Sequence, residues 1–376
     1  MILDLDANAT YTPSDSLRES ISRACTRLGN PSAIHRGGQR ARAAVEEARE
    51  LVRSMVGAAP KDQVIFTSGA SEANNTVVHS FALAGAHIVS TAIEHPCVLE
   101  PLRAAQSRGV SVSLVAPEPN GEVLASSLLS EVRPETKLIS VMAANNETGV
   151  INRISDIARG VRANKSSVVV HTDAAQLVGK VGASFVDLGV DALTISGHKI
   201  GALSGIGALI VKEGISISPY ILGGPQEGKL RGGTENLLGV ISLGLAASDI
   251  LSQGEERFRA MQLVRDAFEA QLLAELPDCQ INGQTAIRLP NTTNVWVPRV
   301  RSDDLLVALD LDGIYVSSGA ACSSGKPEPS HVLLAMGQKE ERVRSTVRIS
   351  FRADQGVALG AEAARRIAKV IKRMRN

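Results

Sequence analysis

Short apolar runs alternate with helical patterns between about residues 60 and 212. The runs are rich in Val and Ile, and segments with apolar residues at helical spacing separate them. Strands that alternate with helices in this way favour a parallel sheet with helices on both faces. The strands predicted are 63–66, 87–91, 110–115, 137–142, 167–171, 192–196 and 207–211, with helices from about Ser71 and over 97–107 and 154–163.

The pattern changes after about residue 250. Residues 255–276 predict a long helix, because apolar side chains recur along one face from Phe258 to Leu272. Strand and helix signals then follow over 293–297, 303–309, 315–317 and 346–351, and a basic helix over 357–374 ends the sequence. This part predicts a smaller α+β domain.

Composition and charge narrow the class of protein. The 376 residues are 44% hydrophobic and 21% charged, which is typical of globular proteins and excludes a disordered, collagen-like or disulfide-scaffold chain. The net charge of +1 gives no overall attraction to nucleic acid or to an anionic membrane. Aromatic residues make up only 3%, which argues against surfaces that stack on bases. We therefore expect no membrane and no direct nucleic-acid partner.

The charge pattern of the chain and the spacing of its cysteines indicate its cellular location and the state of its thiols. The longest stretch without a charged residue, 73–93, contains several polar side chains and is not a membrane span. The N-terminus carries Asp4 and Asp6 where a signal peptide would be basic, so we expect a cytoplasmic protein. The four cysteines have neither CxxC nor zinc spacing, which predicts free thiols and no metal site.

Candidate chemistry falls where the predicted strands end, which is where open parallel sheets bind ligands. Residues 66–72 run from a strand through a glycine turn into a helix, which suits a phosphate cradle or an ordinary Ser cap. Asp173 follows a buried strand and precedes Gln176. This pair could hold a pyridinium nitrogen and a ring oxygen, or Asp173 could cap a helix.

Three further residues lie in similar places. Lys199 follows a strand and a Ser-Gly-His turn, as a Schiff-base lysine or a solvated loop lysine would. His95, in Glu94-His95-Pro96, suits ring stacking and proton transfer or a structural role. Cys322 lies among small and polar residues, as a reactive thiol or a loop cysteine without a role. Together these residues describe a pyridoxal 5′-phosphate site.

The sequence resembles the cysteine desulfurases of the NifS/IscS-like group, within the class V aminotransferase superfamily. The matching segments follow the family's order and span nearly the whole chain. They are Asp6-Ala7-Asn8-Ala9-Thr10, 30–35, 67–75, Glu94-His95-Pro96, 145–149, 171–176, 196–199, 231–236, 317–324 with 328–331, and 347–350.

The resemblance implies a fold type I pyridoxal-phosphate transferase that works as a homodimer. It implies a large cofactor-binding domain over 15–254. The small domain, 1–14 and 255–376, carries the Cys322 loop and Arg348. The implied cofactor-binding residues are Ala70, Ser71, His95, Asn146, Asp173, Gln176, Ser196, His198, Lys199 and Thr234.

The resemblance implies a different role for each group of these cofactor-binding residues. Lys199 binds the cofactor as a Schiff base and later moves protons, and Asp173 pairs with the pyridinium nitrogen. Gln176 bonds the ring hydroxyl oxygen, and His95 stacks on the ring. The phosphate is held by Ala70, Ser71, Ser196 and His198, and Thr234 reaches the phosphate of the other subunit.

For the substrate, the resemblance implies that Arg348 binds the carboxylate of L-cysteine, with Asn146 and Asn8 beside it. The catalytic residues are then Cys322, Lys199 and His95, and Cys322 receives the substrate sulfur as a persulfide. A scaffold or carrier protein takes this sulfur for iron–sulfur cluster, thio-cofactor or thiolated-tRNA biosynthesis. Cys322 could briefly contact a cluster on such a scaffold, and its spacing to 328–331 resembles the long-loop group.

Two other readings stay open at the level of sequence. One is another pyridoxal-phosphate enzyme of the same class, an aminotransferase or a selenocysteine lyase, because fold alone does not decide chemistry. Transamination needs no thiol such as Cys322, so that residue favours desulfuration. The other is a non-enzymatic scaffold, against which Lys199, Asp173, His95 and Cys322 argue together.

Overall fold

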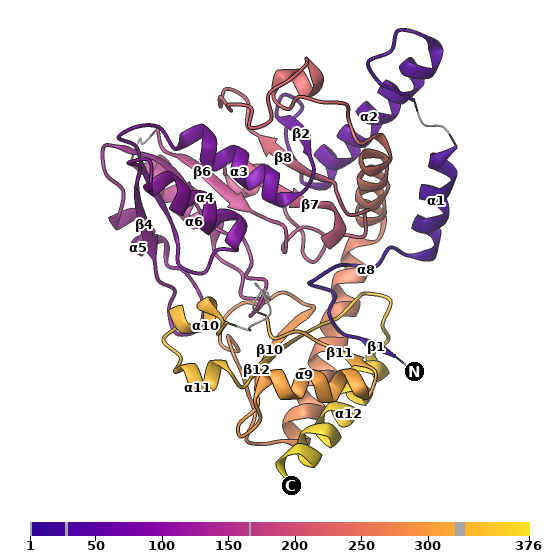
Figure 1. Cartoon of the computed structure of the whole chain (residues 1–376), viewed down its shortest axis with the longest axis vertical. Coiled ribbons are helices and arrows are strands. Elements are labelled where there is room, and N and C mark those ends of the chain that lie inside the picture. The colour runs from indigo at the N-terminus through magenta and orange to yellow at the C-terminus, as the bar shows by residue number, and fades with distance from the viewer. Residues whose placement is uncertain (1, 27–28, 165–166, 320–327) are drawn as a thin grey trace.

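The computed structural model describes residues 2–26, 29–164, 167–319 and 328–376. A seven-stranded sheet with helices on both faces forms the larger part, and a smaller group of strands and helices lies below it in the view of Figure 1. The chain is therefore α/β with a mostly parallel central sheet, as the sequence predicts.

The elements of the larger part follow the alternation expected from the sequence. Its strands are β2 (Gln63–Thr67), β3 (His87–Thr91), β4 (Ser111–Val115), β5 (Thr136–Ser140), β6 (Val169–Asp173), β7 (Ala192–Ser196) and β8 (Gly207–Val211). Its helices are α1 (Asp15–Cys25), α2 (Arg36–Met55), α3 (Ala70–Phe81), α4 (Pro96–Gln106), α5 (Ala125–Ser130), α6 (Ile154–Ala163) and α7 (Phe185–Leu188). Two 3₁₀ turns, η1 (Gly197–Lys199) and η2 (Gln226–Lys229), complete it.

The large sheet has the strand order β2-β8-β7-β6-β5-β3-β4. All neighbouring strands run parallel except β8, which is antiparallel to both β7 and β2. Parallel neighbours need a crossover of a dozen or more residues, usually a helix. Only η1 and a short turn join β7 to β8, so the chain reverses there, and β8 is the antiparallel strand of the mostly parallel sheet that the sequence predicts.

Both faces of this sheet are buried, which explains its unbroken apolar runs. Successive side chains of a strand point to opposite faces. Leu138 and Val169 pack with α3 and α4, whereas their neighbours Ile139 and Val170 pack with α2, α6 and α8. Strands of this kind show no alternation of polar and apolar residues in the sequence.

The smaller part has its own buried core. It contains a parallel pair, β1 (Leu3–Asp4) with β11 (Ile314–Tyr315), and a sheet of order β12-β10-β9. The other bounds are β9 (Gln280–Ile281), β10 (Thr292–Trp296), β12 (Thr346–Ser350), α9 (Ser302–Leu311), α10 (His331–Ala335), α11 (Glu340–Val343) and α12 (Val357–Arg375). Because β1 pairs with β11, the residues that follow β1 lead from this part toward the larger one (Figure 1).

Helix α8 (Leu237–Glu275) connects the two parts (Figure 1). Its first half, to Ile250, packs in the core of the large sheet, and the stretch Val264 to Leu272 packs in the smaller core. The helix thus begins well before residue 255, where the sequence places its start. The predicted domain boundary at 254/255 falls inside this helix, and the domain division stays a prediction.

Within the described residues, α8 is also the one helix whose length and composition would allow it to cross a membrane. Half of its most apolar stretch is buried within the protein, and it packs against α1, α2 and α12. A long core helix gives the same signal, so we interpret α8 as a core helix.

Candidate active site

A cavity of about 990 Å³ lies beyond the carboxyl ends of β2, β6 and β7. It is lined by the predicted residues Asn8, Ala70, Ser71, His95, Asn146, Asp173, Gln176, Ser196, His198, Lys199 and Arg348. Thr234 is exposed and does not line it. Cys322 lies outside the described residues, but Gly319 and Glu328, on either side of that segment, both border the cavity.

The N-terminus of α3 supplies backbone N–H groups to one end of the cavity. Its N-cap is Gly69, which has no side chain to accept these N–H groups, so the alternative of an ordinary Ser cap is wrong. The Glu72 carboxylate accepts the Ser68 N–H at 2.8 Å and ties the loop back to the helix. A Cβ on Gly207 would lie 2.7 Å from Gly69 Cα, so β8 approaches the loop as only a glycine allows. Free N–H groups and the helix dipole favour an anion here.

His198 borders the cavity together with this loop. Its Nδ1 lies 3.1 Å from Thr10 Oγ1. Burial, and then the positive charge of Lys199, lower its pKa to about 4. His198 is therefore neutral at physiological pH and can offer a hydrogen bond, but not a charge, to a ligand.

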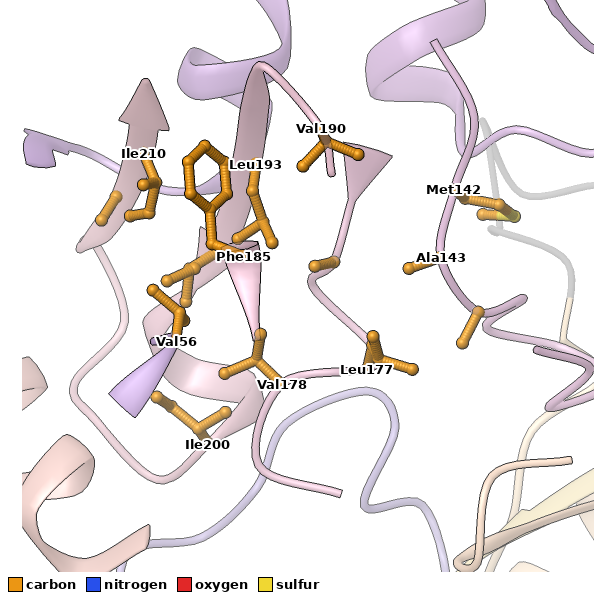
Figure 2. Packing of buried hydrophobic residues seen from close by; sticks show 14 of the residues in the cluster. Val56, Met142, Ala143, Leu177, Val178, Phe185, Val190, Leu193, Ile200 and Ile210 are labelled. Atoms are coloured by element: carbon orange, nitrogen blue, oxygen red, sulfur yellow. The ribbon is translucent and has the colours of Figure 1, made fainter. Parts of the chain in front are cut away.

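Asp173 ends β6 and is buried. Its Oδ2 accepts from Asn74 Nδ2 at 2.7 Å, and its Oδ1 accepts from the Ala175 N–H at 2.9 Å. Turns rather than a helix follow it, so it does not cap a helix. The turn is anchored by Leu177 and Val178, which are buried in the core under the sheet (Figure 2). The carboxylate is thus held in place at the cavity wall.

Lys199 lies in η1, directly after β7. Its Nζ donates to the main-chain oxygens of Asn8 at 2.5 Å and Ala9 at 2.8 Å, so it is not a solvated loop lysine. Burial, and then the charge of Arg348, lower its pKa to about 8, although Asp6 and Asp173 oppose the shift. A much larger fraction of this amine than of an ordinary lysine is therefore unprotonated and nucleophilic near neutral pH.

His95 precedes α4 and faces the cavity. Its Nδ1 accepts the Cys97 N–H at 3.1 Å and lies 3.0 Å from Cys97 Sγ. Desolvation lowers the pKa of His95, while the nearby Asp173 raises it. The ring is therefore mainly neutral at pH 7.

Cys97 also lines the cavity, and sequence reasoning missed it. Asn74 Nδ2 lies 3.1 Å from its sulfur, and burial raises its pKa to about 12. Its position two residues after His95 is the signal that could have found it. The cysteines Cys25, Cys97 and Cys279 are free thiols, as expected.

Arg348 lies on β12, on the opposite wall of the cavity. Its Nη1 donates to the main-chain oxygen of Asn146 at 3.1 Å, and its Nη2 pairs with Asp6 at 2.6 Å. Its buried Nε has no partner among the described residues. Nearby, the Glu147 carboxylate accepts from Ser330 Oγ at 2.5 Å, and burial raises the pKa of Glu147. Sequence reasoning gave Glu147 no role, although it lies inside a matched segment.

The donor set fits pyridoxal phosphate. One cavity offers free N–H groups with hydroxyl and imidazole neighbours for a phosphate, and a buried carboxylate for a pyridinium nitrogen. It also offers a lysine amine with a lowered pKa for an aldehyde. A volume near 990 Å³ is at the upper end of small-molecule sites and can hold the cofactor with an amino acid.

Comparison with known proteins identifies the family. The family model for class V aminotransferases matches residues 4–356. A cysteine desulfurase from Nostoc sp. is 38% identical over 93% of this chain and 88% of its own length. A solved NifS-like protein superposes with a TM-score of 0.91 at 31% identity, over 99% of this chain and 100% of its own. The structure titled SspA in complex with cysteine gives a TM-score of 0.80 at 29% identity, over 94% and 99% of the two chains.

These matches cover both parts of the molecule and therefore include every wall of the cavity. The chain belongs to the class V aminotransferase family, in its pyridoxal-phosphate-dependent cysteine desulfurase group.

Proposed function

We propose that this cavity converts L-cysteine to L-alanine and that the substrate sulfur moves to Cys322. The overall change is L-cysteine plus the Cys322 thiol giving L-alanine plus a Cys322 persulfide, which balances in atoms and electrons. The observation that carries the proposal is the single cavity that joins Asp173, Lys199 and Arg348. Its support is the chemistry of these groups and the family to which the chain belongs.

The chain's own residues divide the work. Arg348 binds the substrate carboxylate, because its unpartnered Nε leaves a donor open and a guanidinium suits a carboxylate. Asn8 and Asn146 support this wall, since Asn8 Nδ2 donates to the main-chain oxygen of Asn146 at 3.2 Å. When bound, pyridoxal phosphate supplies an electron sink for charge at the substrate α-carbon.

The wall of the cavity at the carboxyl ends of the large sheet, here called the sheet-edge wall, binds the cofactor and accepts the substrate proton. Lys199 Nζ holds the cofactor and, once released, takes the proton from the substrate α-carbon, which suits an amine with a pKa of about 8. Asn74 Nδ2 and the Ala175 N–H donate to the Asp173 carboxylate and hold it in place for the ring nitrogen. His95 stacks on the ring, and Ala70, Ser71, Ser196 and His198 hold the phosphate.

The sulfur leaves the site on a carrier protein. We propose that the acceptor is a scaffold or carrier of iron–sulfur cluster, thio-cofactor or thiolated-tRNA biosynthesis. Capture of mixed disulfides at Cys322, with Cys322→Ser as the control, identifies it. Recovery of the same proteins with Cys322→Ser would contradict this route.

We further propose a homodimer in which Thr234 reaches the phosphate site of the partner subunit. Its exposure and its place outside this chain's own cavity support the idea. Mixed dimers of Thr234→Ala and Lys199→Ala chains test it.

A cytoplasmic location likewise stays a prediction, which fractionation of cells tests.

Alanine formation from L-cysteine by the purified, cofactor-loaded protein tests the function directly. Cys322→Ala should keep the visible absorbance of the cofactor and lose alanine and sulfide formation. Cys25→Ala, at an exposed cysteine, is the matched control and should keep full turnover. A keto acid product would indicate a transaminase, no product a scaffold, and full turnover by Cys322→Ala would remove Cys322 as the nucleophile.

A further inference from the structure

Lys180 is among the largest fully buried side chains of the molecule, with 1% of its surface exposed. It lies in the turn that follows Asp173 and Gln176. Gly179, with φ +78°, lets this turn approach Ile200, because a Cβ there would lie 2.8 Å from Ile200 Cγ2. Figure 2 shows Val178 and Ile200 near each other in this packing. A lysine buried so completely is costly unless its amine is well paired or uncharged.

The partners of Lys180 are two side-chain amides. Its Nζ donates to Asn8 Oδ1 at 2.9 Å and to Gln176 Oε1. It makes no ion pair with any residue that the structure describes. Burial, and the nearby charges of Lys199 and Arg348, lower its pKa well below the ordinary value. An uncharged amine has two N–H groups, which match these two acceptors.

The Lys180 amine therefore fixes the orientation of the side-chain amides of Asn8 and Gln176. A group that donates must face the carbonyl oxygen of each amide rather than its nitrogen. The Gln176 nitrogen then lies on the other side, where it donates to the main-chain oxygen of Asn8 at 3.2 Å. Gln176 lines the cavity, and its nitrogen makes no other hydrogen bond with the residues that the structure describes.

The same logic applies to Asn8. Its Oδ1 faces Lys180 and also accepts from Asn291 Nδ2 at 3.0 Å. Its Nδ2 donates to the main-chain oxygen of Asn146 and, at 2.9 Å, to Thr292 Oγ1. Lys180 thus lies at the centre of a network that reaches both walls of the site.

We propose that Lys180 is a positioning residue that makes Gln176 present an N–H donor, not a carbonyl, to the ring oxygen of bound pyridoxal phosphate. The proposal rests on the proposed function only in that the cofactor occupies this cavity. A donor at that oxygen stabilises its negative charge. The stabilisation is largest in the form of the bound cofactor that has lost the proton at this oxygen, so the donor lowers the pH at which that proton leaves.

The test is a pH titration of the visible absorbance of the cofactor-loaded protein. Lys180→Met keeps an unbranched apolar side chain that is one atom shorter and removes the amine. The midpoint should rise by up to about one pH unit, the effect of one weakened hydrogen bond. Gln176→Met should give a similar shift, and the double variant should add nothing further, because the two residues act in series. Lys212→Met, at an exposed lysine, is the control and should not move the midpoint.

Two outcomes would overturn the proposal: an unchanged midpoint in Lys180→Met, or shifts that add fully in the double variant. The latter is the result of a merely structural lysine. If Lys180→Met does not fold, neutron diffraction of the native protein decides instead. It should show the Gln176 nitrogen toward the cavity and two deuterons on Lys180, and an oxygen toward the cavity would contradict us.

Alanine formation by the native protein is measured in parallel. Its absence would remove the proposed function and leave the result on Lys180 standing.

Discussion

The two walls of the cavity hold their functional groups in different ways. On the sheet-edge wall, Asp173 and Lys199 are held by main-chain groups and neutral amides. On the opposite wall, Arg348 donates to the main-chain oxygen of Asn146 and forms an ion pair with the carboxylate of Asp6. The first wall therefore holds its charged groups without an ion pair, whereas the second pairs Arg348 with a carboxylate and leaves the Nε donor open for substrate.

The walls also differ in how the chain builds them. The sheet edge brings together the ends of adjacent strands, which the fold places side by side. The opposite wall joins residues 342 positions apart, because β1 and β12 both belong to the smaller part. Even so, the walls are coupled, since the charge of Arg348 lowers the pKa of Lys199 across the cavity. The difference suits a cofactor wall that stays fixed and a substrate wall whose arginine keeps one donor open for the substrate carboxylate.

The largest expected effect lies on the sheet-edge wall. Lys199→Ala removes both the cofactor linkage and the amine that takes the proton, so alanine formation should fall by about 10³-fold or more. The visible absorbance of the linked cofactor should also disappear. Lys212→Ala is the control. An unchanged spectrum would show that another group binds the cofactor.

A smaller effect should follow on the opposite wall. Arg348→Lys keeps the charge but loses the forked geometry, so KM for L-cysteine should rise about ten- to a hundredfold. The visible absorbance should stay, because this residue touches substrate and not cofactor. Steady-state kinetics with a spectrum of each preparation measures both. Loss of the cofactor with unchanged KM would break the distinction between the walls.

The smallest effect tests the coupling between them. Only the unprotonated Lys199 amine attacks an aldehyde, so the rate at which apoprotein takes up pyridoxal phosphate should rise with pH and level off above about 8. In Arg348→Met the midpoint should move upward, because a charge that lowers the pKa is gone. A rate that climbs steadily toward pH 10 in the native protein would mean that Lys199 has an ordinary pKa.

Much of this fold is predictable from the sequence, and the exceptions have physical causes. The bounds of β3, β7, β8 and α6 agree with the apolar runs. The start of α8 does not, because its first half is buried on most sides and shows no polar face. The direction of β8 leaves no trace in its composition, since alternation of side chains is the same in either direction. No helix is predicted at α1 or at α2.

The residues of the site likewise include some that the sequence predicts and some that it does not. Residues within contiguous motifs, such as Asp173 and Lys199, are recognisable from the sequence. The roles of Asn74 and Lys180 are not, because Asp173 and Asn8, the partners that reveal these roles, lie 99 and 172 positions away and only the folded chain brings them together. Buried polar residues that position others carry no local signal.

The measurement that tests the central claim most directly is mass spectrometry of the cofactor-loaded protein after a single turnover of L-cysteine. The account predicts one additional sulfur atom on Cys322 for each alanine formed, in the native protein and in Cys25→Ala but not in Cys322→Ala. Alanine formed without sulfur on Cys322, or sulfur found on Cys97 instead, would contradict it.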